Sequence, residues 1–293
     1  MNLGYACINM SLPGGFKTCR LDSVHLNGID FVKKITEHNF KRLRDIIKWN
    51  IEHDIRLYRL SSELIPFGSH EVLKDWLWWE EENLCLIAQE VRDLVFANNL
   101  RITIHPWQGD NLSSPHRDVL LRTFADIHFQ TNLLNMFGGT DMILHVGGRH
   151  EGKVNSMQRF RKHFNYLSDT TRKVLRIEND DKVYTVADVF ELCDQLQLNP
   201  LYDFHHDLCA PSIPTLEIKA GLTRFWHNTR MKFHLSTGQR ERLDRSHADY
   251  ISKDTWEEFL SYFGDWDVDV MLECKAKELA IFRIREYEKE VIS

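Results

Sequence analysis

The stretch Lys173-Val174-Leu175-Arg176-Ile177-Glu178-Asn179-Asp180-Asp181 lies near the middle of the 293-residue chain. Its first part, residues 173–177, predicts a short buried strand, because three of its five residues are apolar. The strand ends in Glu178, which opens a run of three carboxylates and one amide. A buried strand that ends in this way delivers acids to one edge of a sheet.

The same arrangement of an apolar strand and a polar end recurs along the chain. Strands are also predicted over residues 3–9, 55–60, 101–106, 141–145, 201–206, 230–235 and 267–273. Apolar residues three and four apart predict helices over 39–51, with Asn39 as N-cap, and over 84–95, 120–134, 155–168, 186–196, 213–227, 254–263 and 276–290. Residues 10–38 are predicted to be mainly loop, and Asn199-Pro200 a turn.

Eight strands that alternate with helices, without a break in composition, favour an α/β fold. We predict that residues 1–293 form a single (β/α)₈ TIM barrel. A doubly wound open sheet is the alternative, although no G-x-G-x-x-G follows the first strand to favour it. A TIM barrel carries its active site at the C-terminal ends of the strands, so function is sought there.

The amino-acid composition and the net charge limit the classes of protein to which this chain can belong. The apolar content of 43% is ordinary for a soluble globular protein, and no apolar run is long enough to predict a membrane span. The N-terminus lacks a secretory signal pattern and the six cysteines are scattered, so we expect a cytoplasmic, intracellular protein without disulfides. The net charge of −6 argues only weakly against nucleic acid, because carboxylates that hold metal ions count in that sum.

Histidines and acids gather at the predicted strand ends. The set is His105, His145, Glu178, Asp203, His206, Lys232, His234 and Glu273, with His70 and His247 in loops that follow two strands. A single histidine at a strand end is more often a hydrogen-bonded polar residue than a ligand. Burying this many carboxylates together costs on the order of several kcal/mol per group unless cations neutralise them. The set therefore predicts a site for several metal ions, whereas Asp180 or Asp181 is expected to cap a helix.

Lys232 does not fit a metal site, because an ammonium beside metal ions is electrostatically unfavourable. The bare amine should be neutral, turned away, or chemically modified. Turning away is disfavoured by the strand period, which places Lys232 and His234 on the same face.

The motifs in their order along the chain resemble the UV damage endonuclease (UvdE) family. The matching stretches are Gly4-Tyr5, Arg59-Leu60-Ser61-Ser62, Phe67-Gly68-Ser69-His70, His105-Pro106-Trp107-Gln108, Leu144-His145-Val146-Gly147-Gly148, Glu178-Asn179-Asp180-Asp181, Asp203-Phe204-His205-His206, Lys232-Phe233-His234-Leu235-Ser236, His247-Ala248-Asp249 and Glu273-Cys274-Lys275-Ala276-Lys277-Glu278. No single motif is specific, but the ordered set is.

The resemblance implies a barrel akin to endonuclease IV that holds up to three divalent ions, typically Mn²⁺, with Zn²⁺ or Mg²⁺ as alternatives. Such enzymes nick damaged double-stranded DNA immediately 5′ to UV photoproducts and leave a 3′-hydroxyl and a 5′-phosphate. The implied ligands are His105, His145, Glu178 as a bridge, Asp203, His206, Lys232 in carboxylated form, His234, His247 and Glu273, with His70 and Asp249 as further site candidates. Glu178, Lys232, His234 and Glu273 are the expected catalytic residues.

One loop departs from the family pattern His-Pro-Gly-Gln-Tyr. Gln108 is retained, but Trp107 replaces the glycine and Gly109 replaces the aromatic residue. Tyr5, Gln108 and Trp107 are therefore the candidate lesion contacts, with packing within the loop as the alternative for Trp107. Arg59, Arg149 and Lys153 are candidate phosphate contacts, although a solvated surface charge is the simpler interpretation of Lys153.

Two other functions fit parts of the pattern. A barrel sugar isomerase also gathers Glu, Asp and His residues around metal ions, but it needs no loops that probe a duplex. A non-catalytic damaged-DNA-binding protein with structural metals would bind irradiated DNA without turnover. For the endonuclease, we expect a monomer that is associated with the nucleoid.

Overall fold

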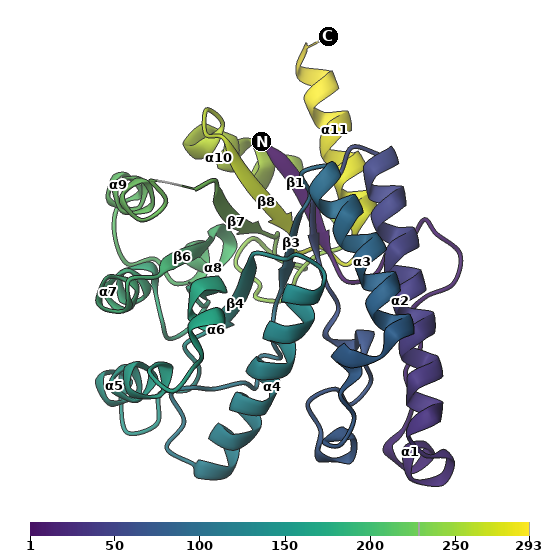
Figure 1. The fold of residues 1–293 in the computed structure, drawn as a ribbon. Helices are drawn as coiled ribbons and strands as arrows, with labels where there is room; N and C mark the ends of the chain where they lie inside the picture. The colour runs from purple at the N-terminus through teal and green to yellow at the C-terminus, as the bar shows by residue number, and fades with distance from the viewer. Residues whose placement is uncertain (228, 293) are drawn as a thin grey trace.

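The computed structural model describes residues 1–227 and 229–292, and its eight strands close into one parallel barrel (Figure 1). Each strand pairs with the next along the chain, and the last pairs with the first. The strands are β1 (Asn2–Ala6), β2 (Leu57–Arg59), β3 (Arg101–Ile104), β4 (Asp141–His145), β5 (Leu175–Glu178), β6 (Asn199–Asp203), β7 (Met231–Leu235) and β8 (Val268–Leu272). The predicted TIM barrel is confirmed.

Helices surround the barrel on its outside (Figure 1). They are α1 (Leu21–Asn27), α2 (Ile29–Glu52), α3 (Glu82–Ala97), α4 (Arg117–Met136), α5 (Lys153–Phe164), α6 (Asp169–Val174), α7 (Val186–Leu196), α8 (Phe204–Cys209), α9 (Thr215–Phe225), α10 (Lys253–Phe263) and α11 (Glu278–Ile292). Three short 3₁₀ segments, η1 (Ser62–Leu64), η2 (Glu71–Leu73) and η3 (Trp78–Glu80), lie between β2 and α3. Within the described part of the chain, no helix combines the length and the apolar character needed to cross a membrane.

The registers of the strands bring the predicted site residues to one rim of the barrel. His145 pairs with Glu178 across β4 and β5, and Asp203 pairs with His234 across β6 and β7. β1 and β2 approach so closely at Gly4 that a Cβ atom there would lie 2.5 Å from the carbonyl oxygen of Leu57. A side chain at this position would therefore force the two strands apart.

The opposite end of the barrel is filled by a buried ion network. Arg101 Nε lies 2.7 Å from Asp141 Oδ2 and its Nη1 lies 3.0 Å from Asp269 Oδ2, while Arg176 Nε lies 2.8 Å from Asp141 Oδ1. Burial alone would raise the pKa of the Asp141 carboxyl, but the two arginines hold it below its ordinary value. The indole of Trp226 faces both guanidinium groups. This end of the barrel is therefore filled by arginine and aspartate side chains whose charges balance one another.

The N-terminal prediction was wrong. Residues 21–27 and 29–52 are helical, so the segment predicted as loop holds α1 and the first part of α2. Asn39 is no N-cap but a buried residue inside α2, where its side chain bonds the backbone N–H and C=O of Lys17 at 2.7 and 2.8 Å. The helical stripe begins already at Val32 and Ile35, but the polar residues around it obscured its start.

Two strand boundaries were also wrong. Lys173 and Val174 end α6, so β5 begins at Leu175. Asn199 and Pro200 belong to β6 instead of a turn. β6 stops at Asp203, whose carboxylate accepts a hydrogen bond from the His206 N–H at 2.8 Å and so caps α8. The chain passes from strand to helix without a loop, and a strand pattern cannot show that change.

Candidate metal centre

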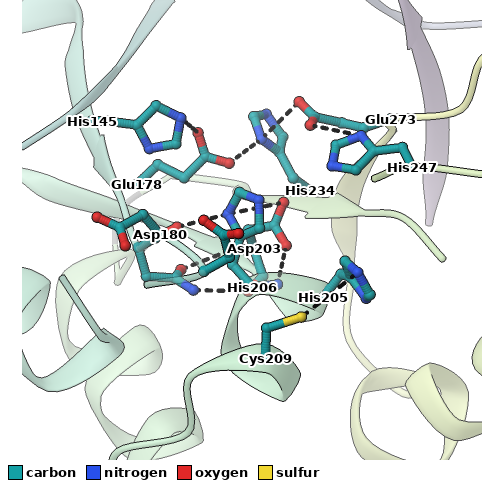
Figure 2. A network of polar contacts seen from close by, with 12 residues as sticks. His145, Glu178, Asp180, Asp203, His205, His206, Cys209, His234, His247 and Glu273 are labelled. Atoms are coloured by element: carbon teal, nitrogen blue, oxygen red, sulfur yellow. Dashed lines mark hydrogen bonds and ion pairs between the residues drawn. The ribbon is translucent and has the colours of Figure 1, made fainter. Parts of the chain in front are cut away.

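Glu178 lies at the middle of the cluster of histidines and acids (Figure 2). Its carboxylate is buried, with Oε1 2.6 Å from His234 Nδ1 and Oε2 3.1 Å from His105 Nε2 and 3.4 Å from His145 Nε2. These partners come from β7 and from the ends of β3 and β4. One carboxylate thus links three strands inside the barrel mouth.

Three overlapping groups of side chains have the composition and spacing of metal sites. Within each group the ligand atoms all lie within 4.8 Å of one another. The groups are His105, His145 and Glu178; Glu178, Asp203 and His206; and Glu178, His234 and Glu273. Glu178 belongs to all three. Carboxylate oxygen and imidazole nitrogen suit Mn²⁺ and Zn²⁺ alike, so the donor set fits the divalent ions predicted from the sequence.

The acids of this cluster need a cation. Burial, followed by the charges of Glu178 and Glu273, raises the pKa of Asp203 to about 8. Its Oδ2 atom is buried without a hydrogen-bond partner, as is His145 Nδ1, among the described residues. Burial also lowers the pKa of His234 to about 4, which keeps the imidazole neutral. Buried oxygen and nitrogen atoms that lack a hydrogen-bond partner and lie beside neutral imidazoles are suitable ligands for a metal ion.

Lys232 is buried inside the barrel. Within the part of the chain that the structure describes, its Nζ has no hydrogen-bond partner. Burial, reinforced by the charge of Arg59, holds the pKa of the amine well below its ordinary value. A neutral amine is therefore the form favoured here, and a neutral amine is nucleophilic.

Glu273 and His247 lie at the β8 side of the cluster (Figure 2). His247 Nδ1 is 3.7 Å from Glu273 Oε2, and the Arg59 guanidinium forms an ion pair with the other Glu273 oxygen. Arg59 Nη2 also lies 2.9 Å from His234 Nε2. Arg59 is thus a buried partner of the cluster instead of a surface cation.

Asn179 has a positioning role that the sequence analysis missed. Its amide donates to the Asp203 carbonyl and accepts from the Asp203 N–H, both at 2.9 Å, which ties β5 to β6. Its own carbonyl oxygen lies 2.9 Å from His206 Nδ1 and fixes that ring, leaving Nε2 free to ligate. The sequence did offer a signal for this role, because Asn179 directly follows a strand that ends in a candidate ligand.

The acids that follow Asn179 act elsewhere. Asp180 accepts hydrogen bonds from the backbone N–H groups of Val183 and Tyr184, so it caps a turn before α7 and not the helix itself. Thr185 and Asp188 form the capping box of α7. Asp181 forms an ion pair with Arg245 at 3.1 Å.

Several candidate residues lie outside the three groups. His70 is exposed and its Nδ1 accepts a hydrogen bond from the Val72 N–H at 3.1 Å, which caps η2. Asp249 is exposed as well. Lys153 is half-buried, and its Nζ pairs with Asp188 Oδ2 at 2.6 Å. Arg149 and Gln108 are exposed, as a DNA contact requires.

Tyr5 cannot probe a lesion in this structure. Its side chain is fully buried, its hydroxyl donates to Asn50 Oδ1 at 2.8 Å, and it accepts from Asn9 Nδ2 at 2.9 Å. The prediction of a lesion contact at Tyr5 is therefore corrected. The phenol is part of the interior polar network behind the barrel rim.

Trp107 is strongly exposed, with 74% of its surface accessible. It follows the candidate ligand His105 by two residues. A Cβ atom on Gly109 would lie 1.8 Å from the Trp107 ring, so the ring fills the space that a side chain at 109 would need. The two departures from the family pattern are thus one structural change.

Comparison with known proteins places the chain in a family. The model of the family UV-endonuclease UvdE matches residues 1–292. The UV DNA damage endonuclease of Clostridium perfringens is 28% identical over 99% of this chain and 71% of its own length. The UV-damage endonuclease of Schizosaccharomyces pombe is 30% identical over 98% of this chain, which spans 50% of that longer protein.

Solved structures agree. The crystal structure of SacUVDE superposes with a TM-score of 0.91 at 29% identity, covering 99% of each chain. Endonuclease IV from Thermus thermophilus shares the fold, with a TM-score of 0.61 at 14% identity over 84% of this chain and 94% of its own. From its matched length and its barrel, the chain belongs to the UV-endonuclease UvdE family, and it is a nuclease.

Proposed function

We propose that this protein is a metal-dependent DNA repair endonuclease. It nicks the phosphodiester immediately 5′ to UV photoproducts, both pyrimidine dimers and 6-4 photoproducts, and leaves a 3′-hydroxyl and a 5′-phosphate. The observation that carries the proposal is the sharing of Glu178 by three ligand groups. A carboxylate shared in this way would help to hold more than one divalent cation, the kind of centre that can hydrolyse a phosphodiester.

The proposed ligands are His105, His145, Glu178, Asp203, His206, Lys232, His234, His247 and Glu273. These residues would hold up to three divalent ions, foremost Mn²⁺, which would supply Lewis-acid stabilisation of the charge on the attacking and leaving oxygens. Glu178 orients His105, His145 and His234 through its two oxygens, and Asn179 orients His206. Glu178, Lys232, His234 and Glu273 are the proposed catalytic residues.

We propose that Lys232 carries a carboxyl group from CO₂. The bond forms between the neutral Nζ and the carbon of CO₂, and one proton leaves the nitrogen. The product is an anionic carbamate in place of a cation. The buried, unpartnered and neutral amine supports this assignment. His70 and Asp249, which lie outside the three groups, remain candidates only at the periphery of the site.

Damaged double-stranded DNA is the proposed partner. Trp107 and Gln108 face the distorted duplex, where an indole offers a stacking surface for an unpaired base. Arg149 contacts phosphate, and Arg59 acts from within the cluster through Glu273. We further propose that the chain works as one domain and as an intracellular monomer at the nucleoid.

The direct test compares a duplex carrying one pyrimidine dimer with its undamaged counterpart, each with and without Mn²⁺. We expect one nick, at the phosphodiester 5′ to the dimer, only with metal and only on damaged DNA. Equal cutting of both duplexes would overturn the lesion specificity. Binding without any nick after metal loading would favour the non-catalytic binding protein, and isomerisation of a free sugar would favour the sugar isomerase.

A further inference from the structure

A small cavity opens beside the candidate metal centre, where β8 leads into α11. It has a volume of about 290 Å³, and its walls include Arg59, His247, Glu273, Lys275 and Lys277. Two of these residues, Glu273 and His247, are proposed metal ligands and lie side by side (Figure 2). The cavity is thus continuous with the proposed active site, and the two lysines form its remaining polar wall.

The two lysines are held by the backbone. The Lys275 N–H donates to the Ala248 carbonyl at 3.2 Å, and the Lys277 N–H donates to the Cys274 carbonyl at 3.3 Å. Lys277 has a φ of +53°, in the left-handed region that residues other than glycine seldom adopt. A tight turn of this kind fixes where both side chains begin, so their place in the cavity wall follows from the fold.

Neither lysine is neutralised by the described residues. Other lysines of the chain have carboxylate partners, such as Lys33 with Glu81 and Lys253 with Glu290. No salt bridge forms to Lys275 or Lys277 within residues 1–227 and 229–292. The adjacent acid Glu278 is buried, and its Oε1 accepts hydrogen bonds from the N–H groups of Met10 and Ser11 at 2.8 and 2.7 Å.

The charges of the cavity point to an anion. The Arg59 guanidinium pairs with Glu273, so the two lysines, which pair with no carboxylate of the described residues, are the remaining cationic groups of the wall. Glu273 is largely buried whereas Lys275 is exposed, so the wall runs from the metal centre outwards to solvent. Lysine side chains bind phosphate oxygens as point charges, and phosphate contacts fix the position of a duplex on a protein.

We propose that Lys275 and Lys277 form a binding site for a backbone phosphate that neighbours the phosphate being cut. The site rests on the proposed function, because its ligand is the DNA strand that enters the metal centre. The buried end of the cavity, at Glu273 and His247, borders the reacting phosphodiester. The outer end, at the lysines, holds the next one and sets the register of the strand.

The test is the salt dependence of DNA binding. Dissociation constants are measured over a series of NaCl concentrations, with metal chelated so that no cutting occurs, on a duplex with one pyrimidine dimer and on its undamaged counterpart. Each phosphate contact contributes about 0.9 to the slope of log K against log salt. Lys275→Gln and Lys277→Gln should each lower the slope by about that amount on both duplexes, because a phosphate contact carries no information about the lesion.

Two further variants sharpen the result. Lys277→Arg keeps the charge and should retain the wild-type slope. Lys48→Gln removes an exposed lysine near the end of α2, at the opposite end of the barrel, and should change nothing. With Mn²⁺ present, the Lys→Gln variants should raise KM severalfold with little change in kcat, as expected for binding energy that substrate and transition state share equally.

The outcomes separate the two proposals. If the wild type nicks damaged DNA but both Lys→Gln variants keep the full slope, the phosphate site is wrong and the endonuclease stands. If the wild type binds duplexes with the lysine-dependent slope but never nicks, the site stands and the endonuclease fails. A wild type that binds neither duplex, both in chelator and with Mn²⁺ present, overturns both. A loss in Lys277→Arg as large as in Lys277→Gln also contradicts the phosphate site.

Discussion

Glu178 and His234 meet across the barrel interior, with 2.6 Å between Oε1 and Nδ1, although they lie on β5 and β7. Both side chains are almost completely buried. This contact joins the carboxylate common to all three ligand groups with an imidazole that burial keeps neutral. The chemistry of the site therefore depends on the charge of Glu178.

Glu178→Gln keeps the shape of the side chain and removes its charge. Nicking of dimer-containing DNA should fall on the order of a thousandfold or more, because metal ions lose their common anionic ligand. The far-ultraviolet circular dichroism should match the wild type. Asp181→Asn is the control, since Asp181 pairs with Arg245 outside the ligand groups, and it should stay active. Equal activity of both variants would remove Glu178 from the bridging role.

Removal of metal should destabilise the protein. Ions that bind only the folded state add about 2.7 kcal/mol when their free concentration is a hundred times Kd. We therefore expect Mn²⁺ to raise Tm by several degrees above the value in chelator. His145→Ala takes one ligand from one group and should reduce the number of bound ions measured by elemental analysis. An unchanged stoichiometry would exclude His145 as a ligand.

The mass of the native protein tests the carbamate at Lys232. In bicarbonate buffer at neutral pH we expect an addition of about 44 Da, the mass of CO₂, that acid removes. Lys232→Met should abolish the added mass and the nicking activity while the fold is retained, because methionine fits a buried site without needing a charge. Lys48→Met should keep both. Full activity at the unmodified mass would refute the modification.

The Trp107 ring occupies the space that a side chain at position 109 would need, so the effects of substitutions at the two positions on DNA binding should not add. Trp107→Ala removes the ring, and Gly109→Ala displaces it, so each should weaken binding of dimer-containing DNA relative to undamaged DNA. The double variant should be no worse than Trp107→Ala, because residues in contact act as one unit. The pair Trp107→Gly and Gly109→Tyr, which restores the family pattern, should regain the preference. Additive losses would show that Gly109 acts through something other than the ring.

Asp110 makes stability depend on pH. Burial, followed by the charge of Asp126, raises the pKa of its carboxyl to about 8. The folded state thus keeps a proton that the unfolded state loses near pH 4, and stability falls as pH rises from about 4 to about 8. Asp110→Asn should leave Tm nearly unchanged at the low end of this range and raise it increasingly toward pH 8.

The control for this pH profile lies on α4. Asp118→Asn alters an exposed acid that pairs with Arg122, and it should leave the profile as in the wild type. Thermal unfolding followed by circular dichroism across the range gives the measurement. A Tm difference for Asp110→Asn that is constant with pH would contradict the raised pKa.

The strand ends could be predicted because each combines an apolar run with a ligand-type residue, and a parallel barrel brings such ends together. That is why Glu178, His234 and Glu273 could be predicted to lie close together, as they do in the structure. Contacts between distant strands could not be predicted, since nothing local to Arg59 on β2 shows that Glu273, which follows β8, lies beside it. The prediction that Tyr5 contacts a lesion was wrong for the same reason. Its hydroxyl is bound inside the protein by Asn50, which is distant in sequence.

The predicted boundaries of helices and strands were wrong where two elements adjoin without a loop. Asp203 is both the last residue of β6 and the cap of α8, so the periodicity changes within one residue. The start of α2 was missed because its apolar positions are separated by charged and polar residues that also suit a loop. In both places the decisive energy comes from packing against residues that lie far along the chain.

The mutual exclusion at positions 107 and 109 also constrains how such a loop can evolve. A chain with an aromatic residue at 109 cannot gain Trp107 in the present orientation, because both rings would claim the same volume. An aromatic residue at 109 and the indole of Trp107 can therefore coexist only if the indole, whose outer ring atoms make the contact and which is largely exposed, takes another orientation.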